Sequence, residues 1–132
     1  MIKKNISITT TPFDLKNLAI LEKSGFNVSI NPYGRRIKEE EVFDFVKNAD
    51  GIIAGTERYD KSLLSKLEKL QVISRVGIGV DNIDLDFVKD QGVKVFNTPD
   101  QPADAVAEYC LGVTISLIRD IFFSNERLFK GE

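Results

Sequence analysis

The chain alternates short β-branched segments with stretches in which apolar residues recur at helical spacing. The β-branched segments span residues 6–8, 28–30, 51–54, 72–74 and 93–96. Strands that alternate with helices in this way form βαβ units, because two parallel neighbours need a crossover connection between them. The sequence therefore predicts an α/β fold with a doubly wound, parallel, five-stranded sheet.

Start and stop residues flank the predicted helices. Asp60 and Asp84 are expected to cap the third and fourth helices, and the acidic run at residues 39–41 should open the second. Negative side chains suit the positive end of the helix dipole. Gly25 and Gly92 stand where the first and fourth helices should end.

The C-terminal segment has a different pattern. From Pro102 the helical spacing continues for roughly two dozen residues, with two neighbouring apolar stripes. These contain Val106, Cys110, Val113, Leu117 and Ile121, and Ala107, Leu111, Ile118 and Phe122. We expect one long helix that is buried on more than one side by a second domain, a second copy of the chain or both. Cys110 would then be a core residue, and Glu108 would need a partner.

Composition excludes several classes of function. With 18 basic and 20 acidic side chains, a net charge of −2 gives no reason to expect a nucleic acid or an anionic membrane as partner. The single cysteine excludes an internal disulfide and a multi-cysteine zinc site. The absence of histidine removes the usual general base and the commonest zinc ligand. No targeting or membrane-spanning segment is recognised, so we expect a cytoplasmic protein without a metal site.

Ligands of doubly wound sheets bind beyond the carboxyl ends of the strands, here residues 9–13, 55–58, 75–82 and 97–101. In the third of these loops, Gly77 and Gly79 let backbone N–H groups converge on a carboxylate or phosphate. A tight turn with positive φ at both glycines explains the same residues without a ligand. A dinucleotide fingerprint is excluded, because Asn82 replaces its third glycine and no acid follows the fifth strand.

Two further loops offer polar groups. After the third strand, Gly55 allows a close backbone approach, Thr56 supplies a hydroxyl and Arg58 can pair with an anion. A capped turn with solvated charges explains these residues equally well. Residues 9–11, three threonines, are more simply helix caps than a phosphate-binding loop.

Several motifs together resemble a known family. They are Arg75-Val76-Gly77-Ile78-Gly79-Val80-Asp81-Asn82-Ile83-Asp84, Asn97-Thr98-Pro99, Val106-Ala107-Glu108 and Ile118-Arg119. In order and spacing they resemble the N-terminal half of D-isomer-specific 2-hydroxyacid dehydrogenases. The run Ala54-Gly55-Thr56-Glu57 is most similar to D-3-phosphoglycerate dehydrogenase-like members.

The resemblance implies a flavodoxin-like substrate-binding domain over residues 1–99. Residues 100–132 would form the crossover helix and the start of a missing nucleotide-binding domain. Such enzymes use NAD to interconvert a D-2-hydroxy acid, here a 3-phosphoglycerate-like one, and its 2-oxo acid, and they are usually homodimers. The preference between NAD and NADP stays open.

The resemblance also implies which residues bind substrate. Backbone N–H groups around Val76, Gly77, Ile78 and Gly79 would hold the carboxylate, and Gly55 and Thr56 would line the same cleft. Phosphoglycerate-type members commonly carry an arginine near the position of Gly55, and whether Arg58 replaces it stays open. The family's catalytic arginine, histidine and glutamate and its cofactor fingerprint would lie beyond residue 132. We therefore expect a fragment or truncated product that is inactive alone.

Two alternatives belong to other functional classes. A stand-alone module could bind a small carboxylate through residues 77–79 for regulation, without catalysis. A phospho-receiver domain shares the predicted sheet but needs acidic residues after the first strand and an aspartate after the third. Those places hold Thr9-Thr10-Thr11 and Ala54-Gly55, so the receiver is excluded.

Overall fold

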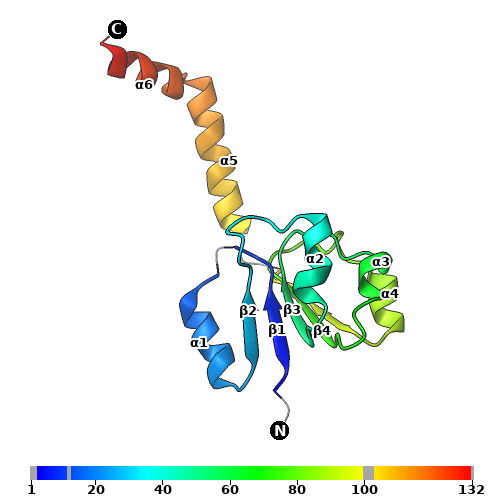
Figure 1. The fold of residues 1–132 in the computed structure, drawn as a ribbon. Helices are drawn as coiled ribbons and strands as arrows, with labels where there is room; N and C mark the ends of the chain where they lie inside the picture. Colours follow the sequence, from blue (N-terminus) through cyan, green and yellow to red (C-terminus); the bar gives the residue numbers. More distant parts are fainter. Residues whose placement is uncertain (1–2, 12, 100–102, 132) are drawn as a thin grey trace. The chain divides into compact units, whose positions relative to one another are not determined.

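The computed structural model describes residues 3–11, 13–99 and 103–131. Its five strands are all parallel, in the order β2-β1-β3-β4-β5 (Figure 1). They are β1 (Asn5–Ile8), β2 (Asn27–Ile30), β3 (Gly51–Ala54), β4 (Val72–Arg75) and β5 (Lys94–Phe96). The predicted parallel α/β sheet is confirmed, with strand bounds within a residue of those expected.

Four helices connect the strands, and two follow the sheet. They are α1 (Leu15–Lys23), α2 (Glu39–Val46), α3 (Lys61–Leu64), α4 (Leu85–Asp90), α5 (Ala103–Ile118) and α6 (Ile121–Lys130). The predicted caps are confirmed, since the carboxylates of Asp60 and Asp84 each accept a backbone N–H at 3.0 Å. Gly25 and Gly92 take positive φ after their helices, at 88° and 70°.

The strand order reverses direction once, at β1. Crossovers between parallel strands are right-handed, so this reversal puts α1 on the opposite face of the sheet from α2, α3 and α4. The core lies on the second of these faces. Ile52 of β3 and Ile73 of β4 are register partners there, and Val46 and Val88 cover them from α2 and α4. All four side chains are buried.

The chain divides into two compact units, Met1–Pro99 and Asp100–Glu132. The second unit corrects the predicted single long helix. Its helical path breaks after Ile118, where Asp120 takes a left-handed φ of 50° before α6 begins. No α-helix continues through a left-handed residue, because the i to i−4 hydrogen bonds cannot form across it. Pro102, the expected first residue, lies outside the described residues.

Cys110 and Glu108 are both exposed in the single chain, so their predicted burial by a second domain or a second copy of the chain stays a prediction. Among the described residues, neither α5 nor α6 contributes a buried side chain. Two helices alone have too little volume to enclose a side chain from solvent. Many apolar residues of this unit are consequently exposed, among them Leu111, Leu117, Ile118, Phe122 and Phe129.

Within the described part of the chain, no helix has both the length and the apolar character that a membrane crossing requires.

Hydrogen bonds fix the loop between β2 and α2. The buried Asn31 side chain donates to the carbonyl oxygens of Thr9 and Arg35, at 2.9 and 2.8 Å. Its own amide oxygen accepts the N–H of Tyr33 at 2.9 Å. One side chain therefore ties the end of β1 to both ends of the turn that follows β2.

The start of α2 adds an ion pair to this loop. Arg35 contacts both carboxylate oxygens of Glu41, at 2.8 and 2.9 Å, and the Lys38 N–H donates to the same carboxylate. The hydrogen bond from Arg35, followed by the one from Lys38, lowers the pKa of Glu41 from 4.5 to about 2. The ionised carboxylate is therefore the form that the fold prefers.

Glu41→Gln should consequently destabilise the protein more at pH 6 than at pH 2. The pKa of Glu41 is lower in the folded state, so its stabilising effect is complete above the unfolded value and disappears as the pH falls through about 2. Urea unfolding of both proteins at the two pH values measures this. Glu40→Gln removes a charge from the same turn without breaking the Arg35 pair, and it should cost less at pH 6. A Glu41→Gln effect that is equal at both pH values would contradict the prediction.

Candidate functional site

The loops beyond the carboxyl ends of the strands enclose a small polar cleft of about 190 Å³. Its lining residues are Thr9, Thr10, Thr11, Arg36, Gly55, Thr56, Glu57 and Val76. The residues come from the loops after β1, β2, β3 and β4. The structure thus brings together three residues predicted for the site, namely Gly55, Thr56 and Val76.

The other three predicted residues continue the chain from Val76 and are not among those that line the cleft. Two of their carbonyl groups accept hydrogen bonds from the segment after β5: Gly77 accepts the Thr98 N–H at 3.0 Å, and Ile78 accepts the Asn97 side-chain amide at 2.8 Å. Among the described residues, no group accepts the N–H of Gly77, Ile78 or Gly79. Backbone donors therefore remain available at the end of β4.

The backbone conformation favours glycine at position 77, because its φ is 143°, a region that other residues rarely adopt. The Arg75 guanidinium, the end of a flexible side chain, occupies the place where a Cβ would stand. The same guanidinium donates to the Val76 carbonyl. Gly79 does not take a positive φ, so the prediction of a turn with two such glycines is wrong.

The hydroxyl of Thr9 connects the loops after β1 and β3. It accepts the Gly55 N–H at 3.0 Å, contacts the Tyr59 hydroxyl at 3.0 Å, and lies 2.8 Å from a carboxylate oxygen of Glu57. Burial raises the pKa of Tyr59, so its hydroxyl stays protonated. Since a carboxylate only accepts, Thr9 donates to Glu57 and accepts from Tyr59 and Gly55. Its donor and both acceptor sites are used.

Glu57 explains why residue 55 is a glycine. Its side chain is buried, and one carboxylate oxygen would lie 2.9 Å from a Cβ at position 55. A larger residue there would push the carboxylate away from Thr9. The sequence suggested that Gly55 allows a ligand to approach. In the structure, its lack of a side chain leaves room for the buried Glu57 carboxylate.

Asn82 holds the same loop from the other side. Its side-chain amide donates to the carbonyl oxygens of Gly55 and Glu57, at 3.3 and 2.7 Å. This is the residue that breaks the dinucleotide pattern, and its place in the structure is to hold the end of β3.

Sequence reasoning missed Arg36 and Glu57. Arg36 lies in the loop after β2 and donates to the Thr56 carbonyl at 2.7 Å. Ligands of such sheets bind beyond the carboxyl ends of the strands, and the loop after β2 lies there too, so this rule could have indicated Arg36. Arg58, which the sequence suggested for an anion, lies instead 3.4 Å from Asp60 and does not line the 190 Å³ cleft.

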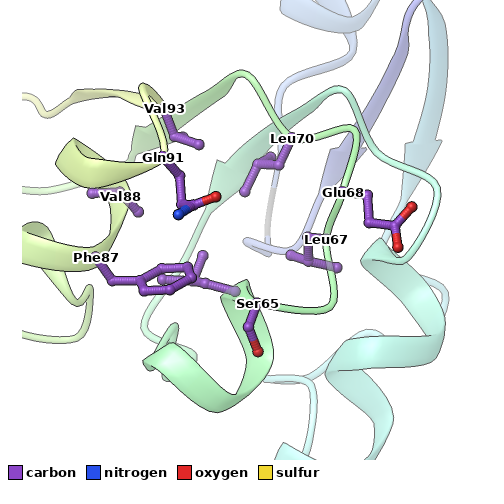
Figure 2. Close-up of a pocket in the computed structure, with 9 residues that line it drawn as sticks. Ser65, Leu67, Glu68, Leu70, Phe87, Val88, Gln91 and Val93 are labelled. Carbon is purple, nitrogen blue, oxygen red and sulfur yellow. The ribbon is translucent and has the colours of Figure 1, made fainter.

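A larger hollow of about 480 Å³ lies between α3 and α4 (Figure 2). Leucine, valine and phenylalanine side chains form most of its wall, and Gln91 points into it. Leu70 and Val93 shortly precede β4 and β5, so this hollow lies at the amino ends of the strands. It has no cation in its lining, so the smaller cleft is the better candidate for binding an acid.

The loop over residues 75–82 does not fit a dinucleotide cofactor. Pyrophosphate is normally bound at a helix N-terminus that directly follows the glycines. Here α4 begins only at Leu85, and the Asp84 carboxylate already occupies its N-terminus. A negative side chain at that place opposes a second anion. Within the described residues, there is also no cluster of acidic or cysteine side chains suited to a metal ion.

Comparison with known proteins gives a family match over nearly the whole chain. A family model described as D-isomer specific 2-hydroxyacid dehydrogenase, catalytic domain, matches residues 6–130.

Two curated relatives illustrate the similarity. A D-3-phosphoglycerate dehydrogenase of Methanocaldococcus jannaschii is 33% identical over 127 residues, which cover 95% of this chain and 23% of that protein. A hydroxypyruvate reductase of Thermotoga maritima is 29% identical over 73% of this chain and 32% of its own. The chain thus spans about a quarter to a third of these relatives.

Solved structures show the same fold. An NAD+-bound 3-phosphoglycerate dehydrogenase of Entamoeba histolytica matches with a TM-score of 0.74 and 33% identity, over 87% of this chain and 39% of that one. A D-lactate dehydrogenase of Aquifex aeolicus, complexed with NAD and lactic acid, has a TM-score of 0.73 at 23% identity, over 96% of this chain and 37% of that one. The second likeness concerns the fold alone.

Thr9→Val should lower the free energy of unfolding by about 2–4 kcal/mol, because valine has the same shape but leaves buried polar groups without their partner. Urea unfolding measures the loss. Thr9→Ser is the matched control, since it keeps the hydroxyl and should cost only about 1 kcal/mol for the missing methyl group. If the serine variant were as unstable as the valine variant, the hydroxyl would not be the stabilising group.

Proposed function

Because the chain belongs to the D-isomer-specific 2-hydroxyacid dehydrogenase family, we propose that it is the substrate-binding part of an NAD-dependent oxidoreductase. The whole enzyme would interconvert a D-2-hydroxy acid and its 2-oxo acid. A 3-phosphoglycerate-like acid is the substrate we propose, with support from the D-3-phosphoglycerate dehydrogenases among the relatives.

The observation that carries this proposal is the set of unused backbone donors after β4. The N–H groups of Gly77, Ile78 and Gly79 have no acceptor within the described residues. They follow directly on Val76, which lines the cleft together with Gly55 and Thr56. A carboxylate accepts several hydrogen bonds at once, and backbone N–H groups bind one without adding a charge. We propose that these six residues bind the carboxylate end of the substrate.

We propose that the two units of the chain have different roles. Residues 1–99 would bind substrate, and residues 100–132 would lead into the domain that binds NAD. NAD supplies the hydride acceptor when it is bound. The chain has no histidine to move the proton, and the loop over residues 75–82 does not fit the cofactor. We therefore expect residues 1–132 to have no turnover by themselves.

Titration of the ¹⁵N-labelled chain with D-glycerate should shift the amide resonances of Gly77, Ile78 and Gly79, because a bound carboxylate would accept their N–H groups. Glycerol, which lacks the carboxylate, is the control and should leave these resonances in place. Shifts confined to the residues of the 480 Å³ hollow, or no shifts at millimolar acid, would argue against the proposed site.

We also propose that the second unit mediates association with another copy of the chain. Its support is apolar exposure, since Leu117 is 66% and Ile118 74% exposed. Contiguous exposed apolar side chains of this kind mark interaction surfaces. Val113 and Leu117 of α5 form the stripe that we expect to make the contact, and Ile121 follows at the start of α6.

Sedimentation equilibrium should therefore find a species heavier than 14.8 kDa at high protein concentration. Leu117→Glu places a charge in the stripe and should weaken association at least tenfold, because burying an unpaired carboxylate is costly. Ala105→Glu introduces the same charge on the opposite face of the same helix and should have a smaller effect. A monomer at all concentrations would rule out association of this chain.

A further inference from the structure

Arg36 lines the 190 Å³ cleft and has no acidic partner among the described residues. The neighbouring Arg35 pairs with Glu41, and Arg58 lies against Asp60. The guanidinium of Arg36 instead donates one N–H to a neutral acceptor, the carbonyl oxygen of Thr56, at 2.7 Å. No carboxylate of the described residues pairs with it. As far as the described residues go, its remaining N–H groups are therefore available and no ion pair neutralises its positive charge.

The loop that carries Arg36 is fixed before any ligand arrives. Asn31 binds the Arg35 carbonyl on one side of it, and the pair between Arg35 and Glu41 ties the loop to α2. The bond to Thr56 then places the guanidinium at the end of β3. A side chain held on a fixed loop loses less entropy on binding than a free one, so this arginine is suited to recognise a charge at a defined place.

Arg36 also connects the candidate site to a second hollow. A neighbouring cleft of about 350 Å³ is lined by Arg36, Ile37, Lys38, Glu39, Val42, Glu57 and Arg58. It shares Arg36 and Glu57 with the smaller cleft. A ligand whose carboxylate lies near Val76 would therefore reach Arg36 with its other end. Lys38 adds positive charge there and Glu39 adds negative charge, while Arg58 is paired with Asp60.

Glu57 adds a negative charge to the lining of both clefts, which should weaken the binding of an anion there. The side chain is only 3% exposed, yet it lines both clefts. One carboxylate oxygen accepts the Thr9 hydroxyl at 2.8 Å, which holds the group on the β1 side of the cleft. An anion bound by Arg36 would feel repulsion from this fixed negative charge. The two side chains should therefore have opposite effects on the affinity for the same ligand: Arg36 should raise it and Glu57 should lower it.

We propose that Arg36 is a specificity-determining residue that binds a second anionic group of the acid, a phosphate ester or a carboxylate, beside Thr56, while the N–H groups that follow Val76 bind the first carboxylate. This assignment rests on the proposed function, because it takes the residues around Val76 as the site of that first carboxylate. Arginine offers two parallel N–H donors to such a group, a geometry that both kinds of anion match.

The test compares the affinity of the chain for D-3-phosphoglycerate, D-malate and D-glycerate, by titration calorimetry or amide shifts. The first two acids carry a second anion, a phosphate ester or a carboxylate, and the third carries a hydroxyl instead. We expect at least one doubly anionic acid to bind about tenfold more tightly than D-glycerate, the effect of one charge-assisted contact. The acid that binds more tightly than D-glycerate shows whether the second anionic group is a phosphate ester or a carboxylate.

Variants separate the two side chains of the cleft. Arg36→Met should abolish the preference for the second anion and leave D-glycerate affinity within about twofold. Glu57→Gln, which keeps an acceptor for Thr9, should strengthen binding of the doubly anionic acid severalfold. Lys89→Met removes an exposed charge from α4 and should change neither ratio. Thermal unfolding checks that each variant is folded.

The outcomes distinguish this inference from the function on which it rests. If none of the three acids binds, the proposed carboxylate site fails and the inference fails with it. If all three bind equally and Arg36→Met changes nothing, the inference alone is overturned. A purely structural role for Arg36 would lower the affinity for all three acids together, and that result would also overturn it.

Discussion

The hydroxyl of Thr9 is the interaction on which the candidate site depends. It is completely buried, and it joins the end of β1 to the Gly55 N–H, the Glu57 carboxylate and the Tyr59 hydroxyl. Parallel pairing brings the ends of β1 and β3 to the same edge of the sheet, but it does not fix the loops that follow. A fully used hydroxyl between them does, and it explains how a carboxylate can lie buried next to a glycine.

Asparagine side chains extend this control to the remaining loops. Asn31 binds the turn after β2, Asn82 holds the carbonyl oxygens after β3, and Asn97 holds the Ile78 carbonyl. In each case the side-chain amide donates to carbonyl oxygens. Within the described residues, the N–H groups at residues 77–79 have no acceptor, so this edge of the sheet has a surplus of donors. Such a surplus favours an anionic ligand.

The sequence predicts the fold well because local signals decide it. Alternating segments, capping aspartates and C-terminal glycines each act within a few residues, and all agree with the structure. The site is less predictable, because Arg36 and Glu57 meet only through the order of the strands, twenty-one positions apart in the chain. The surroundings of Cys110 are hard to predict for a related reason. An apolar stripe indicates that a helix needs cover, but the residues that would cover it are not part of the stripe.

The two parts of the proposed site would recognise charge by different means. Backbone donors at residues 77–79 depend on the path of the chain, so no change of side chain elsewhere removes them. The charge at Arg36 depends on one exposed side chain, whose replacement leaves the Thr9 hydrogen bonds intact. In a site built in this way, a single substitution at the position of Arg36 would change which second group is accepted, while the carboxylate would still be bound. Such a separation would let one fold accept different acids, and the relatives of this chain include phosphoglycerate, hydroxypyruvate and glyoxylate enzymes.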